Sequence, residues 1–181
     1  MIDPALGSVL IVGLALLFAT AALPKFRDLG RFTSVLTAYR VIPEGPARRL
    51  AWGIPCAELA IALALAWPPA RRWAALAAAG LLVVYAAAMS VNLARNRRDL
   101  DCGCAAAGQQ RPIAAWMVRR NLIVALASMA AALPWVPRAL VGADFLTVVG
   151  GGAAVVALYA ALDRLLGDVA PRAALLTKNA P

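Results

Sequence analysis

The stretch WAALAAAGLLVVYAAAMSVNL, residues 73–93, decides the fold class because it runs without a single charged side chain. A helix of about 20 apolar residues, rising about 1.5 Å per residue, is long enough to cross the hydrocarbon core of a bilayer. In lipid every backbone polar group must be satisfied within the segment, which favours a helix over a strand. The stretch therefore predicts a membrane-spanning helix.

Other segments have the same character, so we expect an all-α, polytopic membrane helix bundle with four to five transmembrane helices, five being favoured. The expected spans are residues 5–23, 50–67, 73–93, 121–136 and 145–166. The composition agrees, since 63% of the 181 residues are hydrophobic and 15% are charged, against roughly a quarter charged in ordinary globular chains. We expect residues 1–170 to form one membrane-embedded domain, followed by a short flexible tail at 171–181.

The segment between the first two expected spans contains a second kind of helical pattern. Apolar residues recur at helical spacing over residues 25–39, with charged residues between them. This pattern predicts a short amphipathic helix that lies at the membrane interface.

Basic residues are distributed unevenly between the two sides of the predicted bundle. Of the 18 Lys and Arg residues, only Arg71, Arg72 and Arg138 fall on the side of the N-terminus. Because cytoplasmic loops carry the excess of basic residues, we expect the N-terminus outside and the C-terminus in the cytoplasm of a bacterial cell. Anionic lipid head groups then account for the net charge of +9, and no nucleic-acid partner is expected.

The cysteines form the clearest chemical motif. Cys102 and Cys104 flank Gly103, and a disulfide between residues so close in sequence is strained and therefore labile. A redox-active pair, two ligands of a shared metal and two inert loop cysteines all stay open. With three cysteines and no His in the chain, a closed four-cysteine zinc site cannot form within it, and no metal site is predicted. Cys56 is either a redox relay or a small apolar filler.

Glu58 is an acidic residue near the middle of an expected span. An ionisable group at that depth is costly and usually faces a partner or a cavity. Lys25 and Arg120 are the candidate partners, and Asn121 and Asn92 fall in the same layer. A structural buried pair and a proton-handling carboxylate that faces a quinone are both compatible with this position. A quinone is accordingly the one candidate cofactor, without being required.

Four motifs, in this order, resemble the MauE branch of the MauE/DoxX group of small bacterial membrane proteins. The resemblance covers roughly residues 5–135 and rests on Lys25-Phe26-Arg27-Asp28, Pro55-Cys56-Ala57-Glu58-Leu59, Asp101-Cys102-Gly103-Cys104 and Arg119-Arg120-Asn121-Leu122.

The resemblance implies a multi-pass inner-membrane protein of methylamine utilisation. Such proteins are thought to help mature the disulfide-rich small subunit of methylamine dehydrogenase alongside a thioredoxin-like partner. It also implies functional positions, which are Cys102, Cys104, Lys25, Glu58, Arg120 and Asn121.

Two features depart from this family pattern. The family often follows its second cysteine with an aromatic residue and a glycine, whereas here Cys104 is followed by three alanines and Gly108. In addition, the charge distribution places the cysteines at the cytoplasmic face, although disulfide maturation would occur outside.

The predicted function is thiol–disulfide exchange or electron relay that supports maturation of a partner protein, with Cys102 and Cys104 as the exchanging pair. Lys25, Glu58, Arg120 and Asn121 would form a buried polar layer beside it. The partners would be the bilayer and a thioredoxin-like or disulfide-containing client, with the client, the direction of electron flow and the oligomeric state left open. The alternative is a bundle that binds or carries a quinone or another small apolar ligand without thiol chemistry.

Overall fold

The computed structural model describes residues 1–41, 43–103 and 111–178, and it describes no side chain at residue 44 or beyond residue 166. The expectation of an all-helical fold is confirmed, because the described residues contain two isolated β-bridges and no longer strand. The helices are α1 (Pro4–Arg27), α2 (Leu29–Ala38), α3 (Glu44–Ala66), α4 (Arg71–Ala94), α5 (Ala115–Ala131) and α6 (Gly142–Lys178).

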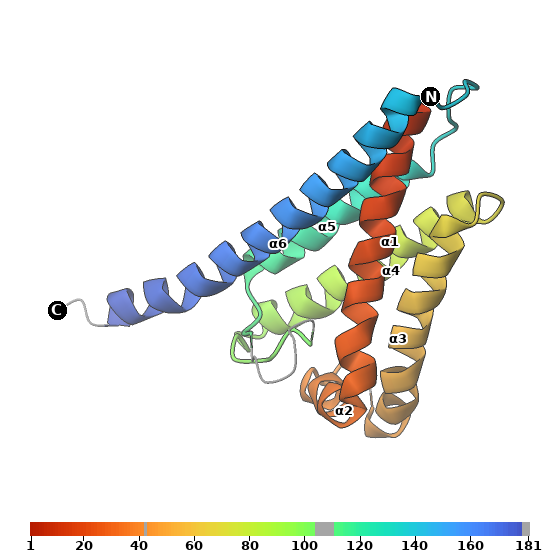
Figure 1. Cartoon of the computed structure of the whole chain (residues 1–181). Helices are drawn as coiled ribbons and strands as arrows, with labels where there is room; N and C mark the ends of the chain where they lie inside the picture. Colours follow the sequence, from red (N-terminus) through yellow and green to blue (C-terminus); the bar gives the residue numbers. More distant parts are fainter. Residues whose placement is uncertain (42, 104–110, 179–181) are drawn as a thin grey trace.

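Four of the described helices are long and apolar enough to cross a membrane. They correspond to four of the five expected spans and are Pro4–Arg27, Gly45–Ala66, Arg71–Ala94 and Gly142–Leu166, the second ending one residue before the expected boundary at 67. The remaining expected span, residues 121–136, corresponds to α5, which has 17 residues and begins earlier, at Ala115. The five longer helices alternate in direction, and α5 runs back alongside α4 (Figure 1). Length and composition thus support four of the four to five expected spans, and a fifth span formed by α5 stays a prediction.

The amphipathic helix is α2, and it begins four residues later than the sequence pattern indicated. Residues 25–27 complete the last turn of α1, where the amide of Asp28 donates to the Pro24 carbonyl at 3.2 Å. The side chain of Asp28 then caps α2 by accepting a hydrogen bond from the Arg31 amide at 2.9 Å. Asp28 thus ends one helix and starts the next, and this break places Lys25 inside the bundle.

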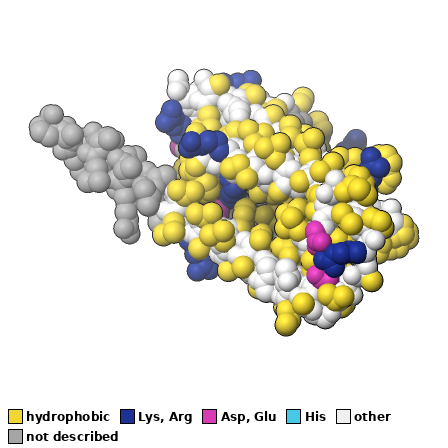
Figure 2. All heavy atoms as spheres, turned by 90° about the horizontal axis from the view of Figure 1, so that it is seen from above, with side chains coloured by type: hydrophobic (Ala, Val, Ile, Leu, Met, Phe, Trp, Pro, Cys, Tyr) yellow, Lys and Arg dark blue, Asp and Glu magenta, His cyan; other side chains and the backbone are white. Residues whose placement is uncertain are grey.

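The core is built from small side chains on α4 that allow close helix packing. Ala75 and Ala78 have no exposed surface, and they pack with Leu65 of α3 and Phe18 of α1. α1 packs against both α3 and α6 (Figure 1). Many large hydrophobic side chains are exposed, and on the face seen in Figure 2 they are widespread while the charged side chains gather in a few groups. An apolar exterior over an alanine-rich interior is typical of a helix bundle that packs in lipid.

α6 lies directly against α1 because glycine replaces larger side chains at the contact. A Cβ atom at Gly151 would come within 3.0 Å of Val9, and one at Gly152 within 3.1 Å of Val12. This close approach fixes where the polar residues further along α6 lie.

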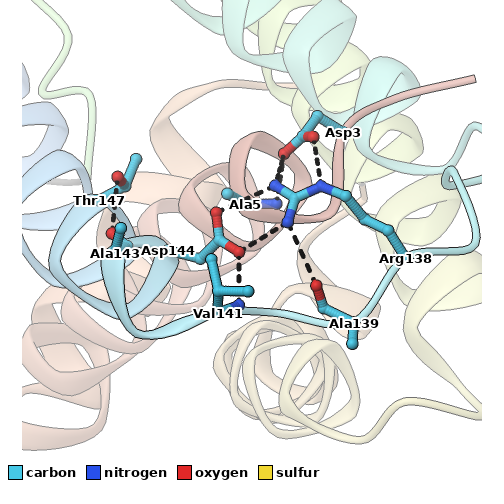
Figure 3. Close-up of polar contacts among 8 residues, drawn as sticks. All are labelled: Asp3, Ala5, Arg138, Ala139, Val141, Ala143, Asp144 and Thr147. Atoms are coloured by element: carbon cyan, nitrogen blue, oxygen red, sulfur yellow. Dashed lines mark hydrogen bonds and ion pairs between the residues drawn. The ribbon is translucent and has the colours of Figure 1, made fainter.

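An ion-pair cluster closes the end of the bundle that carries the N-terminus. Arg138, from the α5–α6 connection, donates to both carboxylate oxygens of Asp3 at 2.8 Å and to both of Asp144 at 2.7 and 3.0 Å (Figure 3). The hydrogen bonds that Arg138 donates hold the pKa of Asp3 below its ordinary value. Because Asp144 and Asp3 accept these hydrogen bonds, they raise the pKa of Arg138. The cluster ties the start of α1 to the start of α6.

Candidate functional site

A buried ion pair joins α1 to α3 near the opposite end of the bundle. Lys25 Nζ donates to Glu58 Oε1 at 2.5 Å, and the Tyr85 hydroxyl of α4 donates to the same oxygen at 2.7 Å. Lys25 is 3% exposed and Glu58 is 0% exposed. Burial of two charges costs several kcal/mol each unless they are paired and hydrogen-bonded, so this three-residue contact is what makes charges at this depth tolerable.

Aromatic rings complete the surroundings of the lysine. The Lys25 ammonium lies 5.5 Å from the ring centroids of Phe32 and Tyr85, within range for cation–π attraction. The second oxygen of Glu58, Oε2, is buried and has no hydrogen-bond partner among the described residues. The carboxylate therefore keeps one acceptor position that the described part of the protein does not satisfy.

A second charged cluster joins α5, α6 and the loop between α4 and α5. Asp163 of α6 accepts from the guanidinium groups of Arg111 and Arg120, one on each carboxylate oxygen. The Arg120 guanidinium also lies 5.3 Å from the ring centroids of Trp116 and Tyr159. A single carboxylate thus holds the loop and α5 against the same point of α6.

Backbone hydrogen bonds fix the segment that carries Cys102. The Cys102 amide donates to the Arg111 carbonyl at 3.0 Å, and the Ile113 amide donates to the Leu100 carbonyl at 2.9 Å. The side chain of Asp101 pairs with Arg31 of α2 at 2.6 Å. The two arms of the loop are therefore clamped together, and the position of Cys102 follows from that clamp.

Gly103 lets the loop pass closely beneath α2. Its φ of +71° lies in the left-handed region, and a Cβ atom there would come within 3.2 Å of Val35 and 3.4 Å of Phe32. A larger residue would be strained by both the backbone angle and the contact. Because Phe32 also faces Lys25, α2 connects the cysteine loop to the buried ion pair.

A cavity of about 480 Å³ joins the two clusters and the cysteine loop. Aliphatic side chains of α1, α4, α5 and α6 line most of it, including Leu10, Leu14, Leu82, Val124 and Val155. The polar side chains that line it include Glu58, Tyr85, Cys102, Arg120, Asn121 and Asp163. One space thus has an apolar part formed by the spans and a polar part next to a thiol.

The structure gathers several of the residues that the sequence singled out. Cys102, Glu58, Arg120 and Asn121 all line the cavity, and Lys25 lies behind Glu58. Arg120, expected as a partner of Glu58, pairs with Asp163 instead. The sequence allowed either residue as the partner of Glu58. In the structure the last turn of α1 brings Lys25 to Glu58, while Asp163 of α6 pairs with Arg120.

Two predicted residues, Cys56 and Asn92, do not line the cavity. Cys104 lies outside the described residues, so its pairing with Cys102 stays a prediction. Cys56 is exposed and faces away from Glu58, its neighbour two positions along α3. Asn92 is buried but accepts a hydrogen bond from Arg97 at 3.0 Å rather than joining Glu58.

Sequence reasoning missed Tyr85, Arg111 and Asp163. Asp163 carried a usable signal, since an acidic residue in an apolar span is costly without a partner. Tyr85 and Arg111 carried none, because a tyrosine within a span and an arginine in a basic loop are both ordinary. Their contacts depend on which helices become neighbours.

Comparison with known proteins gives one consistent result. A family model described as methylamine utilisation protein MauE matches residues 3–136. A methylamine utilization protein MauE of Paracoccus denitrificans is 39% identical over 132 residues, which cover 73% of this chain and 71% of that protein. Its counterpart in Paracoccus versutus is 40% identical over 157 residues, covering 85% and 83%, and that of Methylophilus methylotrophus is 32% identical over 173 residues, covering 91% and 88%. No solved structure matches the chain.

Proposed function

The chain belongs to the MauE family of methylamine utilisation proteins, and on this premise we propose that it performs thiol–disulfide exchange within the membrane in support of the maturation of a partner protein. The observation that carries the proposal is the place of Cys102, which lines a cavity between apolar helices together with the buried carboxylate of Glu58. A thiol held by a clamped loop in a cavity that Arg111 and Arg120 also line is suited to exchange, because nearby cations favour the thiolate.

The exchange balances without another reactant. The Cys102 thiolate attacks one sulfur of a partner disulfide, forming a mixed disulfide and releasing the other partner sulfur as a thiolate. Cys104 then displaces the partner, which leaves a Cys102–Cys104 disulfide and a reduced partner. In the reverse direction, the same steps transfer the disulfide from Cys102 and Cys104 to the partner.

The partner in this proposal is a thioredoxin-like protein or a disulfide-containing client of the methylamine dehydrogenase small-subunit type. The protein would lie in the inner membrane as one domain over residues 1–170, with the N-terminus outside. The cysteine loop would then be at the cytoplasmic end. The cavity supports a relay across the bundle, because it extends from Cys102 to Leu10 in the first half of α1.

Trapping the mixed disulfide tests the proposal. In Cys104→Ser the intermediate with Cys102 cannot resolve, so we expect a covalent adduct that disappears on reduction, detected by its mass shift in non-reducing electrophoresis. The adduct should be absent in Cys102→Ser. Full growth on methylamine by the double variant Cys102→Ser, Cys104→Ser would refute the proposal.

Cys56→Ser tests the relay separately. Because the Cys56 side chain faces away from the cavity, we expect this variant to retain growth and adduct formation. A loss of either would assign Cys56 to the exchange.

A carrier of an apolar ligand without thiol chemistry is the second candidate function, and the volume and aliphatic lining of the cavity favour it. The double serine variant separates the two, because a carrier would keep its full function.

A further inference from the structure

We propose that the cavity binds the head group of a membrane quinone beside Cys102. This inference deepens the proposed function, since a quinone held there is the electron acceptor that returns a reduced cysteine pair to its disulfide.

The size and lining of the cavity suit a small ring that carries an apolar tail. Its volume of about 480 Å³ falls within the range of about 300–1,000 Å³ that small-molecule sites occupy. Leu10, Leu14 and Leu17 of α1 and Val155 and Val156 of α6 line the apolar part. A ligand that is dissolved in the bilayer would find here the same surroundings as its tail has in lipid.

The polar part offers hydrogen bonds to both redox forms of a quinone. The carboxamide of Asn121 and the guanidinium of Arg120 supply N–H donors for the carbonyl oxygens of the oxidised ring. Glu58 Oε2, buried and unsatisfied among the described residues, supplies an acceptor for a hydroxyl of the reduced ring. Satisfying a buried carboxylate oxygen removes a cost that the ligand-free bundle carries.

The charges of the cavity favour a neutral ligand over an anionic one. Asp163 already accepts from both Arg111 and Arg120, and Glu58 is held by Lys25. A phosphate head group would have to take Arg111 or Arg120 away from Asp163 and would lie beside two carboxylates, which disfavours it although Arg164 also lines the cavity. A quinone carries no charge and meets no such repulsion.

The position of Cys102 supplies the chemistry. Oxidation of two thiols, one of them Cys102, breaks two S–H bonds and forms one S–S bond. The two electrons and two protons convert the quinone to the hydroquinone, so the step balances within the site. Cys102 and Glu58 line the same cavity. One ligand bound there would therefore have the electron donor and the hydroxyl acceptor in the same site.

Binding of a decyl-substituted benzoquinone to the full chain in lipid nanodiscs tests the proposal. Val124 lines the cavity, whereas its neighbour Ile123 on α5 is 66% exposed and is not part of the lining. We expect Val124→Trp to weaken saturable binding at least tenfold and Ile123→Trp to change it less than twofold. Ala160→Trp repeats the test at an exposed cavity-lining position on α6, where the larger side chain does not disturb the core.

Two variants separate this inference from the proposed function. Cys102→Ser should lose thiol exchange, whereas Val124→Trp combined with Cys104→Ser should lose quinone binding and still form the mixed disulfide. The quinone site would be overturned if the unmodified protein showed no saturable binding. It would also be overturned if Val124→Trp and Ala160→Trp both bound the quinone as tightly as the unmodified protein. Either result would leave thiol exchange standing. Equal competition by a decyl phosphate would also overturn the quinone site, because the cavity would then be a site for anionic lipid.

Discussion

At the scale of single residues, Glu58 connects the packing of the bundle to the proposed site. It is fully buried, accepts from Lys25 and Tyr85 through Oε1, and keeps Oε2 unsatisfied among the described residues. Glu58 also lines the cavity. The same residue therefore joins α1, α3 and α4 and offers an acceptor to the proposed ligand.

Loss of one partner of this ion pair should destabilise the fold strongly. Lys25→Met leaves the Glu58 carboxylate buried without its cation, and the expected cost is about 3–5 kcal/mol. The double variant Lys25→Met, Glu58→Gln removes the stranded charge and should recover part of that loss. Thermal unfolding in detergent measures both, and equal losses in the single and double variants would contradict the pairing.

Gly103→Ala should change the alkylation rate of Cys102, because its effect is confined to the loop that carries the thiol. The left-handed backbone and the contact with Val35 make the substitution cost about 1–3 kcal/mol locally, and the strain falls on the residue next to the thiol. The alkylation rate of Cys102 in membranes measures this change. Gly80→Ala is the matched control, since nothing lies within 4 Å of a Cβ atom there, and it should leave the rate unchanged.

At the scale of elements, the break between α1 and α2 is the feature that shapes the site. A continuous helix would carry Phe32 and Val35 away from the cysteine loop. The break at Asp28 instead lays α2 against Gly103, and the pair between Arg31 and Asp101 fastens it. α2 thus covers both the loop and Lys25.

Removal of the α2 cap tests this role. Asp28→Ala deletes the acceptor for the Arg31 amide, at an expected cost of about 1 kcal/mol, and α2 should then pack less firmly on the loop. We expect faster alkylation of Cys102. Asp28→Asn keeps a capping side chain and should react at the unmodified rate, so equal acceleration in both variants would contradict a capping effect.

At the scale of the whole molecule, the two ends of the bundle are held by different chemistry. The end with the N-terminus is closed by Arg138 between two carboxylates (Figure 3). The other end carries the cysteine loop, α2 and the Lys25–Glu58 pair. Most basic residues fall in the segments at this second end. The prediction that this end faces the cytoplasm is therefore also a prediction of the side on which the cysteine loop lies.

The closure at Arg138 predicts a dependence on acid. Because the folded state lowers the pKa of Asp3 below 3.8, the contribution of Asp3 is fully present above that value and is lost as the pH falls through the lower pKa of the folded state. Arg138 stays charged throughout. The midpoint of thermal unfolding should therefore fall on acidification below pH 3.8, and Asp3→Asn should show a smaller fall.

Reporter fusions test the predicted orientation. A phosphatase fused at the α3–α4 turn should be active, because that turn lies at the N-terminal end of the bundle and is expected outside. A fluorescent protein fused to the C-terminus should fluoresce in the cytoplasm. The opposite pattern would reverse the orientation and place Cys102 on the outer side.

The sequence by itself determined the helical class and four candidate spans, and it singled out Cys102 and Glu58 as candidate site residues. Uninterrupted apolar length and isolated charges are local properties, so they can be recognised without knowing the neighbours. The start of α2 was missed because Asp28 acts as a cap only once the backbone has turned.

Only the tertiary structure decided which groups meet. Lys25 rather than Arg120 pairs with Glu58, Asp163 gathers two arginines, and Tyr85 completes the carboxylate contact. These choices depend on helix rotation and on close approaches such as that of Gly151 to α1. Contacts between distant segments arise from packing geometry, which a linear pattern of residue types does not contain.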